Sequence, residues 1–187
     1  MVNLWLVRHA LPLVAPGTCY GRLDVPADPA ATQGAAQALA QALPTGLRTI
    51  SSPLQRCTQL AESLCQLRPP ATFDTDTRLA EMDFGAWEGQ AWDQISPAAL
   101  DAWTHNFAHH APGGGETVSI FMSRVAAALD AVRSGKQDTL WITHAGVMRA
   151  VTVLQTLGKA TPLRSEQWPR EALPFGGWQR WVLDPSA

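Results

Sequence analysis

Length and charge exclude several broad classes of protein. The chain has 187 residues, 46% of them hydrophobic, which is enough apolar sequence for one compact domain with a substantial core. Its 14 basic and 16 acidic residues give a formal net charge of -2, so no strong overall field attracts nucleic acid or an anionic membrane. We therefore expect a single domain over residues 1–187 that binds neither nucleic acid nor a membrane.

The cysteines and the N-terminal residues favour a cytoplasmic protein. Cys19, Cys57 and Cys65 are odd in number and form no C-x-x-C pair, which argues against a disulfide framework and against a zinc ribbon. The apolar run at residues 4–7 is followed at once by an arginine and a histidine. That run is too short for the core of a signal peptide or for a membrane span.

The start of the chain predicts two strands separated by a helix. Residues 3–7 form a nearly continuous apolar run of strand formers, which is typical of a strand buried on both faces in a parallel sheet. Residues 30–43 are rich in Ala, Gln and Leu and end at Pro44, which predicts a helix. Residues 47–50 predict the next strand.

A second helix is expected to begin at a serine cap. Ser51 and Ser52 directly precede Pro53, and a serine N-cap followed by proline at the first helical position is a common start signal. The helix is predicted to run to about Leu67 and to end before the two prolines at positions 69 and 70. Arg56 would then lie in its first turn.

The second half of the chain repeats the alternation of helix and strand. Residues 117–134 predict a helix, residues 139–143 a strand, residues 147–157 another helix and residues 178–183 a last strand. Strands that alternate with helices predict a parallel sheet covered on both faces. We expect an α/β fold, a three-layer α/β/α sandwich with a mainly parallel central sheet.

Residues 84–115 interrupt this regular pattern. The segment contains several glycines and prolines, and we expect a loop-and-helix excursion over the site rather than a second domain. Trp87, Trp92 and Trp103 fall within it. Because most tryptophans are packing residues, we expect packing roles for these three, with stacking on a ligand as the alternative.

Candidate chemistry lies at the carboxyl ends of three predicted strands, where open α/β sheets bind their ligands. Arg8 and His9 follow the first strand, Ser51 and Ser52 follow the second, and His144 follows the strand at 139–143. Guanidinium groups bind phosphate oxygens through paired, charge-assisted hydrogen bonds, which suits Arg8 and Arg56. The turn after His144 starts a helix, and the Ala145 amide at such a start is a candidate anion donor. The set favours a phosphate monoester as ligand.

These segments, taken in order, resemble the histidine phosphatase family, which includes cofactor-dependent phosphoglycerate mutases and α-ribazole phosphatases. The matching pieces are Leu6-Val-Arg-His9, the serine pair with Arg56, the stretch at 79–89 that contains Glu81, and Thr143-His-Ala-Gly146. The resemblance implies a phosphoglycerate mutase-like fold. It also implies that His9 accepts the phosphoryl group, that Glu81 is the proton donor and that His144 is the second histidine of the site.

One stretch departs from the family pattern. The family usually has glycine after the first histidine, then a threonine and an asparagine that bind phosphate, whereas this chain has alanine at position 10 and apolar residues after it. Other groups must then complete the phosphate pocket. The candidates are Thr18, the Cys19 amide and Arg22.

The residues and the resemblance together predict a phosphomonoester hydrolase that acts through a phosphohistidine. The expected substrate is a small phosphorylated metabolite, with α-ribazole 5'-phosphate as the specific candidate. The alternatives are phosphoryl transfer of the phosphoglycerate mutase type, disfavoured because such mutases are usually longer, and a catalytically silent phosphate-binding regulator. We expect a monomer or a homodimer.

No metal and no cofactor is expected. His105, His109 and His110 invite a metal interpretation because positions 105 and 109 share a face if the segment is helical. No cysteine or carboxylate completes a recognisable ligand pattern with them. Phosphoryl transfer to a histidine relies on positioned cationic groups, so the predicted chemistry requires no metal.

Overall fold

The computed structural model describes residues 1–158 and 164–184, so residues 159–163 and 185–187 of the expected domain range lie outside the described residues. Its centre is a five-stranded sheet in the order β3-β2-β4-β1-β5. The strands are β1 (Val2–Arg8), β2 (Arg48–Ser51), β3 (Phe73–Thr75), β4 (Thr139–Thr143) and β5 (Trp178–Leu183).

Strand pairing confirms a mainly parallel sheet. β3, β2, β4 and β1 run parallel to one another, and only β5 runs antiparallel, beside β1. Arg8 pairs with Thr143, and Ser51 pairs with Ile142. The carboxyl ends of β1, β2 and β4 therefore lie side by side at one edge of the sheet, as the strand-end argument requires.

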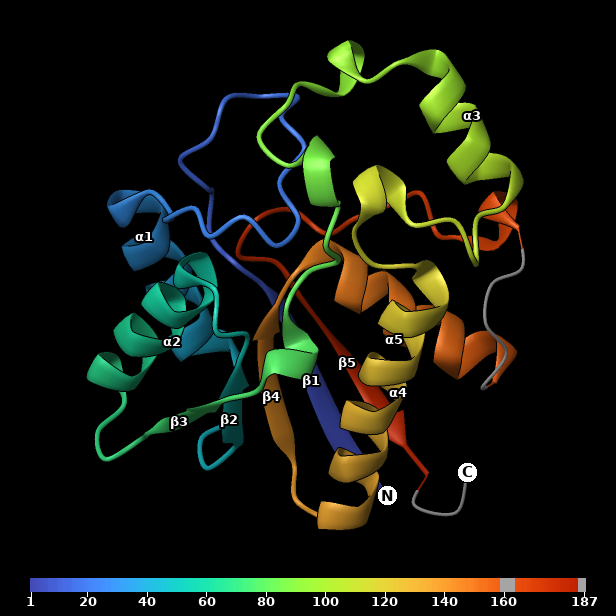
Figure 1. Cartoon of the computed structure of the whole chain (residues 1–187). Helices are drawn as coiled ribbons and strands as arrows, with labels where there is room; N and C mark the ends of the chain where they lie inside the picture. The colour runs from blue at the N-terminus through green and yellow to red at the C-terminus, as the bar shows by residue number, and fades with distance from the viewer. Residues whose placement is uncertain (159–163, 185–187) are drawn as a thin grey trace.

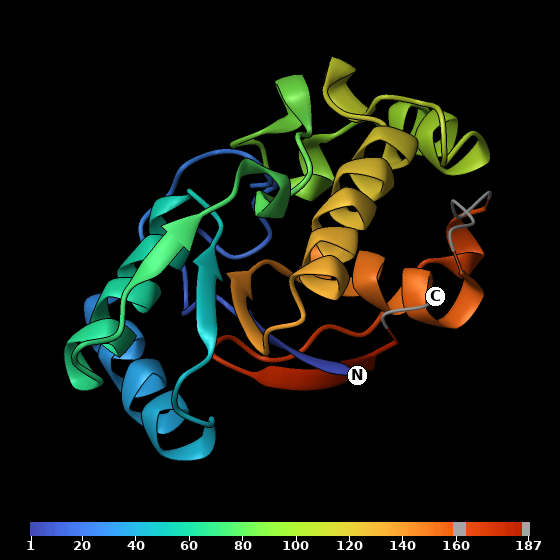
Figure 2. The same cartoon turned by 90° about the horizontal axis from the view of Figure 1, so that it is seen from below.

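Helices cover both faces of the sheet, which completes the expected three-layer α/β sandwich. The helices α1 (Pro29–Ala42) and α2 (Gln55–Leu67) lie on one face, and α4 (Val118–Gly135) and α5 (Ala145–Leu157) on the other (Figures 1 and 2). Alternate side chains of β1 point to opposite faces. Trp5 and Val7 join the core beneath α1 and α2, whereas Leu4 and Leu6 join the core beneath α4 and α5.

Short helices and loops lie beyond the carboxyl edge of the sheet, where residues 84–115 form the upper part of the view in Figure 1. Phe107 from this segment is buried in the same core as α4 and α5. The elements of the segment are η2 (Gly85–Trp87), η3 (Trp92–Gln94), α3 (Pro97–His105) and η4 (Pro112–Gly114). Two further short helices, η1 (Thr77–Leu79) and η5 (Ser165–Gln167), lie outside it.

The predicted serine cap of α2 is wrong. Ser51 is still the last residue of β2, and the helix begins only at Gln55, with no side-chain bond from its N-cap residue Leu54. Asp24, from a distant loop, accepts a hydrogen bond from the Gln55 amide at 2.7 Å. A tertiary contact thus satisfies the helix start that the local sequence assigned to serine.

β3 was not predicted. It has three residues, Phe73 to Thr75, of which the middle one is an aspartate, and it pairs along the edge of β2. So short and polar a strand has no periodic signal in the sequence.

Two further observations concern the cysteines and the described helices. All three cysteines are free thiols, with Cys19 and Cys57 buried. Among the described helices, none is both long and apolar enough to cross a membrane.

Candidate active site

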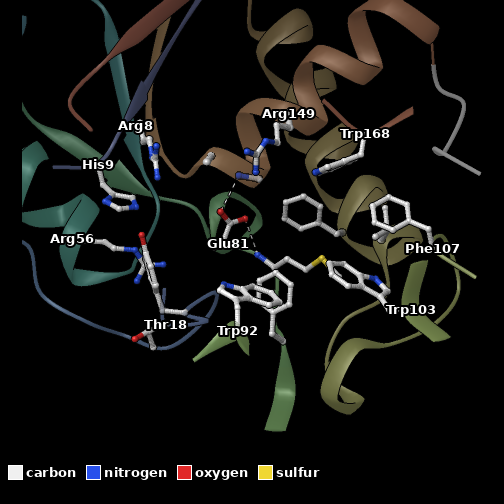
Figure 3. Close-up of a pocket in the computed structure, with 17 residues that line it drawn as sticks. Arg8, His9, Thr18, Arg56, Glu81, Trp92, Trp103, Phe107, Arg149 and Trp168 are labelled. Carbon is white, nitrogen blue, oxygen red and sulfur yellow. Dashed lines mark hydrogen bonds between the residues drawn. The ribbon is translucent and has the colours of Figure 1, made fainter. Parts of the chain in front are cut away.

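A cavity of about 340 Å³ opens at the carboxyl edge of the sheet, where the strand ends meet the loops above them. Figure 3 shows that polar and aromatic side chains occupy different parts of it, with Glu81 and Arg149 between them. The charged and polar residues come from separate segments of the chain. They include Arg8, His9, Thr18, Arg56, Glu81 and Arg149.

His9 lines the cavity directly after β1 and is held in one tautomer. Its side chain is 2% exposed, and its Nδ1 lies 2.7 Å from the carbonyl oxygen of Ala10. A carbonyl can only accept, so Nδ1 carries the proton and donates it, which leaves the lone pair on Nε2. Burial first, then the charges of Arg56 and Arg8, lower the pKa of His9 to about 3. His9 is therefore neutral at pH 7, the state in which an imidazole has a free lone pair.

Arg56 lies at the start of α2 and is fully buried while it lines the cavity. Two of its nitrogens donate to backbone carbonyls of one loop, to Leu23 at 2.8 Å and to Gly21 at 2.6 Å. A guanidinium group has five N–H donors, and these two bonds orient it without using all of them. The remaining donors can bind an anion in the cavity.

Arg8 is held by the chain that precedes β5. It donates to the Leu173 carbonyl at 2.6 Å, and its guanidinium carbon lies 4.0 Å from the ring centre of Phe175. Burial lowers the pKa of Arg8, while the nearby Tyr20 and Glu81 oppose that shift. Arg8 and Arg56 thus place two anchored guanidinium groups in the cavity that His9 lines.

Glu81 reaches the cavity from the turn after η1. Its Oε1 accepts a hydrogen bond from the Met82 amide at 3.0 Å, and its Oε2 accepts one from the Gly146 amide at 2.9 Å. The second bond joins Glu81 to the first turn of α5. A Cβ atom at position 146 would lie 2.1 Å from Glu81 Oε1, so any side chain there would displace the carboxylate from this position.

His144 lies beneath His9 rather than on the cavity wall. The two ring centres are 5.2 Å apart, His144 is 1% exposed, and its Nε2 forms a 2.8 Å hydrogen bond with Ser52 Oγ. Burial first, then Arg56, lower its pKa well below the ordinary value. The structure thus brings His144 to the site and gives Ser52 a role beside it, while contact of His144 with phosphate stays a prediction.

Of the further groups predicted to bind phosphate, some line the cavity and others do not. Thr18 and Ala145 line the cavity, and their contact with phosphate stays a prediction. The Cys19 amide donates to the Gln90 carbonyl at 2.7 Å, so it is already used. The Arg22 side chain is 67% exposed, lies outside the cavity wall and pairs with Asp83 at 3.7 Å. The Cys19 and Arg22 assignments are therefore wrong, because the loop turns these groups away.

Sequence reasoning missed Arg149, which points into the cavity from α5 (Figure 3). Its Nε donates to the Glu171 carbonyl at 3.2 Å and one terminal nitrogen donates to the Arg170 carbonyl at 2.9 Å. A signal was available, because position 149 lies on the first helical turn after the segment that resembles the family. One arginine within a helix is more often a surface residue, so this signal is weak.

For the tryptophans of the 84–115 segment, sequence reasoning favoured packing and kept stacking on a ligand as the alternative. Six rings line the far part of the cavity, and neighbouring ring centres are 5.4 to 6.3 Å apart in a continuous series. They therefore pack on one another and also bound the cavity. The six are Phe84, Trp92, Trp103, Phe107, Phe121 and Trp168.

Comparison with known families agrees with this geometry. The sequence model of the histidine phosphatase superfamily (branch 1) matches residues 4–170, which contain every cavity residue described above. The chain belongs to this superfamily. The resemblance drawn from the short motifs is thereby confirmed at the level of the superfamily.

Two similar proteins are at least 30% identical to this superfamily member, and they have different names. A protein of Hydrogenobacter thermophilus called "Putative phosphoserine phosphatase 2" is 30% identical over 162 residues, which are 83% of this chain and 79% of the relative. The crystal structure of TTHB049 from Thermus thermophilus has a TM-score of 0.72 at 32% identity, and the match covers 96% of this chain and 92% of that one.

A third match supports the fold. A mycobacterial glucosyl-3-phosphoglycerate phosphatase has a TM-score of 0.79 at 21% identity, and the match covers 96% of this chain and 89% of that one. Of the two proteins that are 30% or more identical, the Hydrogenobacter relative is named as a phosphatase. None of the three is named an α-ribazole phosphatase, so the expected branch is not confirmed.

The three histidines considered as metal ligands lie apart from this site. His105 Nδ1 donates to the Asp101 carbonyl within α3 at 2.7 Å, and His109 Nδ1 lies 3.3 Å from Ser119 Oγ. Within residues 1–158 and 164–184, no group of three or more His, Cys, Asp or Glu side chains is placed to hold a metal ion.

Proposed function

We propose that this superfamily member hydrolyses a small phosphomonoester through a phosphohistidine formed on His9. The observation that carries the proposal is the state of His9, which is neutral, keeps its lone pair on Nε2 and lies beside two anchored guanidinium groups. A neutral imidazole can attack phosphorus, and the guanidinium groups stabilise the charge on the phosphoryl oxygens.

In the first step, the Nε2 lone pair of His9 attacks phosphorus while the bond from phosphorus to the ester oxygen breaks. Arg8 and Arg56 bind the phosphoryl oxygens during the transfer. Glu81, protonated when substrate binds, gives its proton to the departing alcohol oxygen. The alcohol leaves, and phosphohistidine and a Glu81 carboxylate remain.

In the second step, the Glu81 carboxylate takes a proton from a water molecule as that water attacks phosphorus. The bond between phosphorus and Nε2 breaks, inorganic phosphate leaves, and His9 returns to its neutral state. Glu81 thus acts as acid and then as base, as microscopic reversibility requires. The steps use protein groups alone, and we propose that the enzyme needs no metal.

The six rings that line the far part of the cavity form an aromatic wall, and this wall favours a substrate with a bulky leaving group. Aromatic side chains bind flat or apolar groups, and a cavity of about 340 Å³ exceeds the volume that a phosphate ion occupies. We propose α-ribazole 5'-phosphate, whose alcohol carries an aromatic base, as the specific substrate. Phosphoserine, the substrate in the name of the Hydrogenobacter relative, is the second candidate, with Arg149 as the group that would bind its carboxylate.

The test of the proposed reaction compares wild-type protein with His9→Ala on p-nitrophenyl phosphate. Loss of the nucleophile should lower kcat by about 10³-fold or more, since removal of a covalent catalyst leaves only binding and electrostatic effects. The His105→Ala variant, altered on an exposed helix, is the control and should keep wild-type turnover. Equal turnover by wild type and His9→Ala would contradict the proposal.

A substrate panel separates the candidates. Phosphate release from α-ribazole 5'-phosphate, phosphoserine and 3-phosphoglycerate is compared by kcat/KM, and we expect α-ribazole 5'-phosphate to exceed the other two by at least about 10²-fold. In the same reactions, isomerised 3-phosphoglycerate without phosphate release would instead indicate a mutase. Absence of turnover with every ester would indicate a phosphate-binding regulator.

A further inference from the structure

The carboxylate of Glu88, which lies outside the cavity, accepts hydrogen bonds from four backbone amides. Oε2 of Glu88 accepts hydrogen bonds from the amides of Gly21 at 3.0 Å and Leu23 at 2.7 Å. Oε1 accepts from the amides of Arg22 at 2.8 Å and Phe84 at 2.9 Å. Glu88 does not line the cavity. Its four bonds join the loop at 21–23 to the segment that begins the aromatic wall.

The same loop carries the carbonyls that orient Arg56. One peptide unit, between Gly21 and Arg22, is bonded to both groups. Its N–H donates to Glu88 at 2.8 Å, and its carbonyl accepts from Arg56 at 2.6 Å. Leu23 also contacts both groups through two successive peptide units, because its amide donates to Glu88 and its carbonyl accepts from Arg56. A single layer of backbone therefore lies between the carboxylate and the guanidinium group.

The loop has no room to shift toward Glu88 or its neighbours. A Cβ atom at Gly21 would lie 1.9 Å from the Met82 carbonyl oxygen, 2.5 Å from the Phe84 ring and 2.9 Å from Glu88 Oε1. Contacts this close mean that the backbone of the loop is pressed against the 82–88 segment. The position of the Gly21 backbone is thus fixed by packing against this segment and by its hydrogen bond to Glu88.

We propose that Glu88 is a positioning residue for Arg56, an inference that rests on the proposed role of Arg56 in phosphate binding. The hydrogen bond from the Arg22 amide to the carboxylate polarises the peptide unit between Gly21 and Arg22, and this makes the Gly21 carbonyl a stronger acceptor for the guanidinium group. Glu88 thereby fixes the plane of Arg56 and the direction of its remaining donors. It acts through the loop and touches no substrate.

Glutamine is the informative substitution because it keeps the shape of the side chain. Its amide has one oxygen acceptor, and its NH₂ group would face two backbone N–H donors in place of a carboxylate oxygen. In Glu88→Gln, the loop should therefore move and Arg56 should lose its alignment. Glu88→Asp is the second variant, which keeps the charge but shortens the side chain by one methylene.

A double-mutant cycle tests the coupling between Glu88 and Arg56. Binding of tungstate, an oxyanion probe that needs no turnover, is measured by calorimetry in wild type, Glu88→Gln, Arg56→Lys and the double variant. We expect Glu88→Gln to weaken binding about 10-fold in the wild-type background and less than about 2-fold in the Arg56→Lys background. Equal weakening in both backgrounds, or none in either, would overturn the proposal.

Arg68→Met is the matched control. Arg68 also organises backbone groups, donating to the carbonyls of Pro44 at 2.9 Å and Leu43 at 2.6 Å, but it lies at the opposite end of α2, about 18 Å along the helix from Arg56. Its loss should lower thermal stability and leave tungstate affinity unchanged. If Arg68→Met weakens tungstate binding as much as Glu88→Gln does, the Glu88 effect is one of general stability and the proposal fails.

The cycle also separates this inference from the proposed reaction. A wild-type protein that binds tungstate but hydrolyses no ester contradicts the proposed function, while the binding cycle still decides the role of Glu88. A wild-type protein that binds no tungstate overturns both. Should Glu88→Gln fail to fold, Glu88→Asp replaces it in the cycle, with the same expected loss of effect in the Arg56→Lys background.

Discussion

The two site histidines lie where a positive charge is unfavourable. Burial, followed by the charge of Arg56, lowers the pKa of both His9 and His144, that of His9 to about 3. In an unfolded chain a histidine has a pKa of about 6.5. The unfolded state therefore binds protons at mildly acidic pH that the folded state does not bind, so their contribution to stability is complete above about pH 6.5 and is lost as pH falls toward 3.

This difference predicts how His9 affects acid stability. The free energy of unfolding of wild type should fall between pH 7 and pH 4.5, and in His9→Asn the fall should be smaller by about 2 kcal/mol, because asparagine does not titrate. Urea unfolding at the two pH values gives the measurement. His105→Asn, on the exposed face of α3, is the control and should show the wild-type fall. A full wild-type fall in His9→Asn would contradict the assigned pKa.

At the scale of elements, the aromatic wall depends on two chain segments that interlock through glycines. A Cβ atom at Gly113 would lie 2.1 Å from the Phe84 carbonyl oxygen, and one at Gly85 would lie 2.3 Å from the Gly113 carbonyl oxygen. The Glu116 amide also donates to the Asp83 carbonyl at 2.8 Å. Backbone meets backbone here, and no side chain can yield to relieve a clash.

Two neighbouring glycines provide a matched test of this packing. Gly113 and Gly114 both have positive φ, 60° and 75°, but a Cβ atom at Gly114 meets nothing within 4 Å. Gly114→Ala should cost about 1 kcal/mol from the backbone conformation alone, and Gly113→Ala should cost at least about 3 kcal/mol because it also separates the two segments. Equal losses in urea unfolding would show that the segments do not interlock.

The element boundaries show which local signals the sequence carries. The strands predicted at 139–143 and 178–183 agree with β4 and β5, because strand-forming residues there directly follow the turn residues Asp138 and Gly177. The start of α2 was misplaced because its cap comes from Asp24, which is remote in sequence. Local patterns predict what neighbours along the chain determine, and a cap supplied by another loop leaves no local trace.

At the scale of the whole molecule, strands, helices and loops together form the cavity. The sequence predicted some of the residues that line it and missed others. Parallel strands must end at one edge, so the convergence of Arg8, His9 and Arg56 followed from topology alone. Arg149 and Trp168 could not be placed in the same way, because each reaches the cavity by packing of helices and loops that have no strand-end rule. The rings of the 84–115 segment depend on how that segment folds back over the sheet.

Phosphoryl transfer to His9 is tested most directly by trapping the phosphoprotein. Wild type is mixed with a phosphate ester and quenched in alkali within one turnover, since phosphohistidine survives alkali and is hydrolysed in acid. Peptide mapping by mass spectrometry then locates the phosphoryl group. We predict an acid-labile phosphoryl group on His9 that is absent from His9→Asn, whereas steady turnover without such an adduct, or an acid-stable adduct on a serine or threonine, would contradict the mechanism.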